Sequence, residues 1–155
     1  PQVKNNVKHF SVSDGKFKFR LISKGKNFIV GTSADTFSLK SNQGINIPLS
    51  IYNENYQKKD YFNFLRKYKG VKFDAIGISF VQSSSIIKAI KEKYPNKVIV
   101  SKLENFKGLK NLTEIIDLSD VIMIDRGDLA AEIGDKYLFN AIKKISQETK
   151  KKERV

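Results

Sequence analysis

The sequence predicts an α/β fold in which a β-rich first part precedes strands that alternate with helices. Residues 7–52 contain short alternating runs typical of β-strands, separated by Gly, Ser and Asn. From residue 71 an apolar strand followed by an amphipathic helix occurs three times, with short connections, which favours parallel, helix-covered strands. The 155 residues are 40% hydrophobic and 29% charged, which is typical of a globular protein.

The β-rich part is expected to begin with a hairpin. Phe17, Phe19 and Leu21 alternate with basic residues, and Asp14 and Gly15 form a turn signal between this run and the preceding apolar residues. Three further short strands are expected at residues 28–30, 36–39 and 45–49.

Helices and strands are expected to alternate after Pro48. Asp60 is expected to cap a helix that reaches Tyr68, and Ser83–Ser85 to cap a second helix that Pro95 ends. Two more helices are expected around residues 112–116 and 137–145, and the three apolar strands at residues 73–81, 98–100 and 121–124. A closed barrel of eight such units needs about 250 residues, so the pattern indicates either an open α/β domain or an arc of a barrel.

The net charge of +13 raises the question of nucleic-acid binding. Only four of the 29 Lys and Arg residues are Arg, which supplies the specific bidentate contacts, so we interpret the charge mainly as a lysine-rich surface. Nucleic acid is therefore not an expected partner, whereas attraction of small anionic substrates is an open alternative. No apolar run approaches the ~20 residues that span a membrane, and the chain has no Cys, which is compatible with a cytoplasmic location.

Acidic residues are concentrated in one segment of this basic chain. Residues 114–135 contain seven carboxylates and only one basic residue, Arg126. Such a local negative cluster is what a divalent-cation site requires, although several of these residues are also expected simply to decorate helix starts and exposed faces.

Two strand ends carry residues capable of chemistry. Lys102 and Glu104 follow an apolar strand two positions apart, so they are expected to project to the same side, next to Asn105. A lysine there could stabilise a transferring phosphoryl group or an enolate, and the carboxylate could hold a metal; an ordinary surface ion pair is the alternative.

The second of these strand ends is residues 121–134, VIMIDRGDLAAEIG. Gly127 is expected to allow a tight turn, with the backbone amides of Gly127 and Asp128 facing an anion and the Asp128 side chain facing a metal. The alternative is that Asp128 merely caps a short helix that begins at Leu129.

These segments resemble the pyruvate kinase family. SKLENFKGLKNLTEI (101–115) and SDVIMIDRGDLAAEI (119–133) are similar to the family's lysine-x-glutamate-asparagine strand and its IMVARGDLGxEIP segment, at the same separation. IGISFVQ (76–82) resembles the preceding barrel strand, and VSDG (12–15) and NQGINIP (42–48) resemble parts of the β lid domain. The resemblance implies part of a (β/α)8 TIM barrel with three βα units (residues 51–155), preceded by a small lid-domain segment (residues 1–50).

The resemblance also implies roles for individual residues. Lys102 would neutralise the phosphoryl group that passes from phosphoenolpyruvate to ADP, giving pyruvate and ATP. Glu104 and Asp128 would hold Mg²⁺ or Mn²⁺, and the amides of Gly127 and Asp128 would bind the substrate carboxylate. Arg126, with Asp125 and Asn105, is expected to support this site.

The sequence departs from the family pattern in and around the motif. Asp125 replaces an alanine, which adds negative charge beside an anionic substrate, and Gln82 replaces an arginine. Ser13, Ala130 and Gly134 replace an aspartate, a glycine and a proline.

Other parts of the family pattern have no counterpart in these 155 residues, including the strands that supply the K⁺ ligands. We therefore expect the chain alone to be nearly inactive, and to act with a complementary chain or as a homo-oligomer. Two alternatives are a metal-dependent aldolase or lyase of the phosphoenolpyruvate/pyruvate barrel group, and a non-catalytic remnant.

Overall fold

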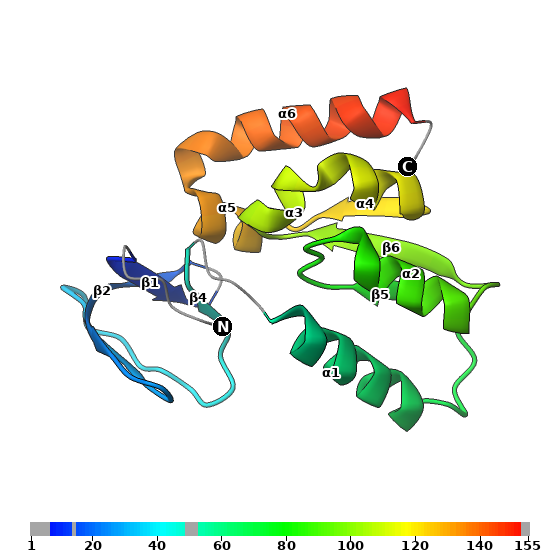
Figure 1. The fold of residues 1–155 in the computed structure, drawn as a ribbon. Helices are drawn as coiled ribbons and strands as arrows, with labels where there is room; N and C mark the ends of the chain where they lie inside the picture. The colour runs from blue at the N-terminus through cyan, green and yellow to red at the C-terminus, as the bar shows by residue number, and fades with distance from the viewer. Residues whose placement is uncertain (1–6, 14, 49–52, 153–155) are drawn as a thin grey trace.

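The computed structural model describes residues 7–13, 15–48 and 53–152, and it confirms the α/β class. The first sheet is antiparallel with strand order β3-β2-β1-β4, and the second is parallel with order β5-β6-β7 (Figure 1). The antiparallel strands are β1 (His9–Val12), β2 (Phe17–Lys24), β3 (Ile29–Thr32) and β4 (Ile45–Asn46). The parallel strands are β5 (Ala75–Ile78), β6 (Val98–Leu103) and β7 (Val121–Ile124).

The expected hairpin forms between β1 and β2. Phe10 pairs with Phe19 in the antiparallel register, and their rings stack at 4.8 Å between centroids. Ser13 and Gly15 both adopt positive φ angles, 55° and 85°, which are conformations that tight turns use. Asp14, the other expected turn residue, lies outside the described residues.

Residues 36–39 do not form the expected strand. Phe37 instead packs against the rings of Phe17 and Phe19, at centroid distances of 4.4 and 5.2 Å. The apolar signal therefore reflects a side chain that covers the sheet, not a segment that joins its hydrogen-bond ladder. The strand expected at 45–49 is limited to Ile45–Asn46 within the described residues, which stop at Pro48 and resume at Asn53.

Six helices accompany the parallel sheet in the described part of the chain. They are α1 (Glu54–Lys67), α2 (Ser84–Lys93), α3 (Phe106–Lys110), α4 (Leu112–Leu118), α5 (Arg126–Ile133) and α6 (Asp135–Lys151). Ser83 caps α2 as expected, whereas the prediction that Asp60 caps the first helix is wrong. Asn53 caps α1 by accepting hydrogen bonds from the backbone N–H groups of Asn55 and Tyr56. No described helix is sufficiently long and apolar to cross a lipid bilayer.

The main hydrophobic core lies on one face of the parallel sheet. Ile99 and Leu103 of β6 are fully buried there with Ile115 and Ile116 of α4, and Ser101 between them bonds Ser119 at 2.6 Å. On the opposite face Val98 and Met123 remain 43% and 48% exposed, so the described residues cover one face of the sheet more fully than the other.

The loop after β6 is anchored to the end of the neighbouring β5 segment. Asn105 is buried; its Oδ1 accepts from the Gly108 amide at 2.8 Å and its Nδ2 donates to the Val81 carbonyl at 3.1 Å. A Cβ atom at Gly108 would lie only 2.5 Å from that same carbonyl oxygen. The close approach of α3 to this carbonyl therefore requires glycine, and it fixes the chain directly after Glu104.

Replacing Gly108 with alanine is expected to destabilise the fold by about 1–3 kcal/mol, because backbone must shift to admit the methyl group. Helix propensity alone predicts the opposite sign, a gain of about 1 kcal/mol. Gly77→Ala is the matched control, since a Cβ there meets no atom within 4 Å. Urea unfolding of the two variants and the unsubstituted chain tests this, and equal stabilities for the two variants would contradict it.

Candidate functional site

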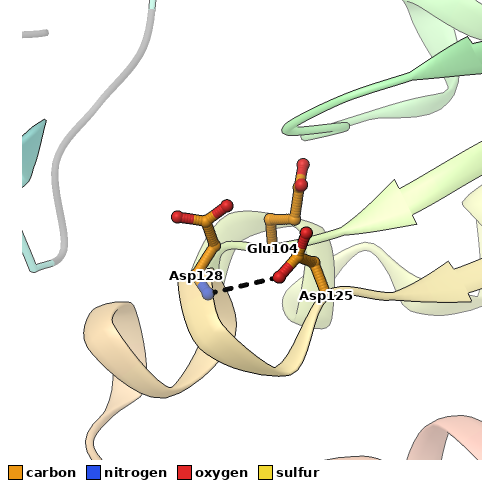
Figure 2. Close-up of side chains that lie close together, drawn as sticks. All are labelled: Glu104, Asp125 and Asp128. Atoms are coloured by element: carbon orange, nitrogen blue, oxygen red, sulfur yellow. Dashed lines mark hydrogen bonds between the residues drawn. The ribbon is translucent and has the colours of Figure 1, made fainter. Parts of the chain in front are cut away.

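Three carboxylates from neighbouring strand ends converge at the carboxyl edge of the parallel sheet. Glu104 follows β6, Asp125 follows β7, and Asp128 lies in the first turn of α5, as Figure 2 shows. One oxygen atom from each residue lies within 4.8 Å of the other two. The parallel register, which pairs Leu103 with Ile124, brings the two strand ends to the same level.

Glu104 is only 1% exposed, so its carboxylate depends on protein partners. Its Oε2 accepts a hydrogen bond from the backbone N–H of Phe80, and its Oε1 lies 2.6 Å from the Lys102 ammonium. Burial raises the pKa of Glu104, against the hydrogen bonds from Lys102 and Phe80 that lower it. The buried carboxylate is thus held by one cation and one peptide group.

The Phe80 amide reaches Glu104 because the chain turns sharply after β5. Phe80 has a φ of +51°, a left-handed conformation that is unfavourable for a bulky residue. Gln57 of α1 donates to the Phe80 carbonyl at 2.9 Å, and the Tyr61 hydroxyl donates to the Ser79 carbonyl. Helix α1 therefore stabilises a strained turn, and this turn places the Phe80 N–H group where it donates a hydrogen bond to Glu104.

Lys102 lies between two carboxylates. Its Nζ is 2.6 Å from Glu104 Oε1 and 3.3 Å from Asp125 Oδ2, and its side chain is 22% exposed. The hydrogen bond to Glu104 raises the pKa of Lys102 despite partial burial, so the ammonium is charged at neutral pH. The expectation that Lys102 and Glu104 project to the same side agrees with this contact.

Helix α5 begins earlier than the sequence indicated. Asp125 is its N-cap and accepts from the Asp128 amide at 3.5 Å, the dashed line in Figure 2. The expected tight turn at Gly127 and the alternative cap by Asp128 are therefore both wrong. Arg126, the first helical residue, and Gly127 are both exposed in the first helical turn. This places the N–H groups of the first turn beside the carboxylates.

Asp128 has a partner that sequence reasoning missed. Its Oδ1 accepts a hydrogen bond from Asn46 Nδ2 at 2.7 Å, across 82 residues of sequence. Asn46 belongs to the antiparallel sheet, and the only signal for it was its place in the NQGINIP segment. Gln82, where the resembling family has arginine, is buried and donates to Gln57 at 3.1 Å, so it is part of the contact between α1 and the segment between β5 and α2.

The donor set of this cluster, defined as Glu104, Asp125, Asp128 and Lys102, fits a divalent cation with an anion beside it. Carboxylate oxygens are hard ligands of the kind that Mg²⁺ and Mn²⁺ prefer. Lys102 supplies the positive charge that an anionic ligand needs. The residues present are thus compatible with metal-assisted chemistry on an anionic substrate.

The raised pKa of Glu104 predicts a pH-dependent effect of Glu104→Gln. Because the pKa of Glu104 is higher in the folded chain than its unfolded value of 4.5, protonated Glu104 contributes to the free energy of unfolding. This contribution is fully present below pH 4.5 and is lost as pH rises through the folded-state pKa. The substituted glutamine side chain cannot ionise, and Lys102 keeps Asp125 as a partner. We expect the stability of Glu104→Gln relative to the unsubstituted chain to improve from pH 4 to pH 7 in urea unfolding.

Glu148→Gln is the control with the opposite sign. A hydrogen bond from Lys151 lowers the pKa of the exposed Glu148, so its contribution is present at pH 7 and lost as pH falls. The relative stability of Glu148→Gln is therefore expected to worsen, slightly, from pH 4 to pH 7. The same trend for both variants would contradict the account of the Glu104 site.

Comparison with known proteins agrees with the resemblance seen in the motifs. Residues 2–155 match the family described as pyruvate kinase, barrel domain. The pyruvate kinase of Encephalitozoon cuniculi is 30% identical over 144 residues, which cover 92% of this chain and 34% of that protein. The pyruvate kinase of Methanocaldococcus jannaschii is 31% identical over 131 residues, 79% of this chain and 28% of that protein. The chain thus spans about a third of the length of these relatives, and it belongs to the pyruvate kinase family.

Proposed function

We propose that this chain carries part of the active site of a pyruvate kinase, which transfers a phosphoryl group from phosphoenolpyruvate to ADP and yields pyruvate and ATP. The observation that carries this proposal is the position of the Lys102 ammonium beside Glu104 and Asp125, in a cluster completed by Asp128. Sites of parallel α/β folds lie at the carboxyl ends of strands, where this cluster lies. The names of the relatives support the same reaction.

Within this proposal, Glu104 and Asp128 hold Mg²⁺ or Mn²⁺, and Asp125 is close enough to contribute. A divalent ion held there supplies positive charge to phosphoryl and enolate oxygens. Lys102 neutralises charge on the transferring phosphoryl group. Asn105 supports the site by fixing the chain directly after Glu104.

The start of α5 is proposed to bind the substrate carboxylate. The N–H groups of Gly127 and Asp128 lie in its first turn, where the helix dipole favours an anion, and the Asp128 N–H also donates to the Asp125 cap. Arg126 is proposed to support this turn from its first position. The K⁺ that the family implies is proposed to bind outside these 155 residues.

We propose that residues 51–155 form three βα units of a (β/α)8 barrel and that residues 1–50 belong to a lid. The parallel sheet supports the first assignment, because β5 and β7 each pair only with β6 within the described residues. The partly exposed Val98 and Met123 lie on the face that a closed barrel would line. Further chain, a complementary partner or a second copy would complete the barrel, and the 155-residue chain alone is proposed to be nearly inactive.

A metal-dependent aldolase or lyase is the second candidate, and Asp125 is the observation that favours it. Its carboxylate pairs with Lys102 at 3.3 Å, which reduces the positive charge offered to a phosphoryl group. Such an enzyme would keep the metal and the enolate and would not use a nucleotide. A non-catalytic remnant is the third hypothesis.

Titration calorimetry with Mn²⁺, and then with oxalate as an enolate mimic, tests the proposal. We expect the chain to bind Mn²⁺ and oxalate, and Glu104→Gln and Asp128→Asn each to weaken Mn²⁺ binding by about tenfold or more. Lys102→Ala is expected to weaken oxalate binding while Mn²⁺ binding persists. Asp117→Asn, an acidic residue paired with Lys152 away from the cluster, is the control.

The outcomes separate the three hypotheses. Absence of Mn²⁺ and oxalate binding would support the remnant. Binding of both with no nucleotide binding in a completed barrel would support the aldolase or lyase. Pyruvate production by the purified 155-residue chain that Lys102→Ala abolishes would contradict the proposed inactivity of the isolated chain.

Asp125→Asn is expected to raise oxalate affinity at saturating Mn²⁺ by about three- to tenfold, because it removes a negative charge next to Lys102. Asparagine also caps helices well, so the stability of α5 should be retained. Asp125→Ala removes the charge and the cap together, and it should show the same gain in affinity with a loss of about 1 kcal/mol in unfolding free energy. Unchanged or weaker oxalate binding in both variants would contradict this account of Asp125.

A further inference from the structure

Asn46 is a buried residue of the antiparallel sheet that contacts the proposed metal site. It is 5% exposed, and its Nδ2 donates to Asp128 Oδ1 at 2.7 Å. Asp128 lies in the first turn of α5, 82 positions away. This hydrogen bond joins the antiparallel sheet to α5, the helix that follows the parallel sheet, at the cluster of carboxylates.

The backbone of Asn46 is held by its pairing with β1 and by its neighbours in sequence. Asn46 pairs with Ser11 of β1, and nearby the Ser13 amide donates to the Gly44 carbonyl at 3.1 Å. The next residue, Ile47, is buried with Phe10 in the core of the antiparallel sheet. The Asn46 side chain therefore projects from a backbone that its strand pairing and the buried Ile47 hold in place.

The orientation of the Asn46 amide follows from charge. Its N–H group donates to the carboxylate of Asp128, and such charge-assisted bonds are among the stronger hydrogen bonds in proteins. Its buried Oδ1 has no hydrogen-bond partner among the described residues. The reverse orientation would place that oxygen against a carboxylate, so the bond to Asp128 is retained although one buried oxygen is left unsatisfied.

The antiparallel sheet also approaches α5 beyond this single bond. A Cβ atom built on Gly15, in the turn between β1 and β2, lies 3.6 Å from Ala131 Cβ. A cavity of about 350 Å³ lies between the antiparallel sheet and α5, and its lining includes Phe10 of β1 and Gly127 and Ala130 of α5. The antiparallel sheet thus approaches α5 at two places, at Asp128 in its first turn and at Ala131 further along the helix.

We propose that Asn46 is a positioning residue that orients the Asp128 carboxylate for a divalent cation. The inference rests on the proposed metal role of Glu104 and Asp128. By holding one oxygen of Asp128 from a fixed strand, Asn46 makes cation affinity depend on the docking of the antiparallel sheet against α5. Groups that orient a metal ligand from behind commonly change affinity by about 10- to 100-fold when removed. By reciprocity, cation binding stabilises this docking.

Mn²⁺ titration of the full 155-residue chain tests the role of Asn46. We expect Asn46→Ala to weaken Mn²⁺ binding by about tenfold. Asn46→Thr keeps a residue that favours β-strands but is too short to reach Asp128, and it should weaken binding to a similar extent, so the test survives if the alanine variant does not fold. Ser11→Ala is the matched control, because Ser11 is the buried partner of Asn46 on β1 and should leave Mn²⁺ affinity unchanged.

A double-substitution cycle separates positioning from a general loss of structure. If Asn46 acts through Asp128, then Asn46→Ala should cause little further loss of affinity in a chain that already carries Asp128→Asn. An Asn46→Ala loss that persists undiminished in that background, or a loss equalled by Ser11→Ala, would overturn the inference. So would folded Asn46→Ala and Asn46→Thr chains that bind Mn²⁺ as tightly as the unsubstituted chain, a result that leaves the proposed function standing. Failure of the unsubstituted chain to bind Mn²⁺ would instead overturn the proposed metal site, and the role of Asn46 with it.

Discussion

The buried carboxylate of Glu104 is the constraint on which the rest of this structure depends. A carboxylate that is 1% exposed loses its hydration, and that loss is costly for an ionised group unless protein groups replace the water. Here the Lys102 ammonium and the Phe80 amide replace it. The left-handed Phe80, the contacts of α1 that hold its turn, and the Asn105 anchor after β6 are all explained as parts of this arrangement.

The fold was predictable where one local signal decided the structure. The strand at 121–124 was predicted with its observed bounds, because a run of four apolar residues, three of them β-branched, between polar residues favours a strand. The start of α1 was not predicted correctly, because Asn53 and Asp60 are both residue types that cap helices well. Tertiary contacts support the earlier start, since Glu54 pairs with Lys107 and accepts from Ser83 at 3.0 Å. The local sequence pattern around α1 carries no information about these distant partners of Glu54.

The candidate site was predictable as far as strand ends reveal it. Lys102, Glu104, Asp125 and Asp128 all lie at or just beyond the ends of apolar strands, and the parallel register then requires those ends to meet. Phe80 escaped prediction because its contribution is a backbone N–H group, which every residue type but proline possesses. The role of Asn46 was not predicted because its partner, Asp128, lies 82 residues away in α5. Backbone hydrogen bonds to a side chain, and side-chain contacts between distant segments, depend on the tertiary structure and produce no periodic pattern in the sequence.

Asp125 combines three roles that explain how the chain tolerates an acid where the family has alanine. It caps α5, it pairs with Lys102, and it is one of three carboxylates in the cluster. The three carboxylates and Lys102 together carry a net charge of −2 when all three carboxylates are ionised, and a bound divalent ion would cancel that charge. With an alanine at position 125 and a divalent ion bound, the cluster would carry a net charge of +1 and would attract an anion. Under the proposed function, the acid therefore favours the cation over the anionic substrate. The chain's net charge of +13 acts in the other direction, because lysines within about 8 Å of an approaching anion still attract it at physiological ionic strength. Under the proposed function, attraction of the anion would therefore come from the lysine-rich surface as a whole, and the cluster itself would chiefly hold a cation.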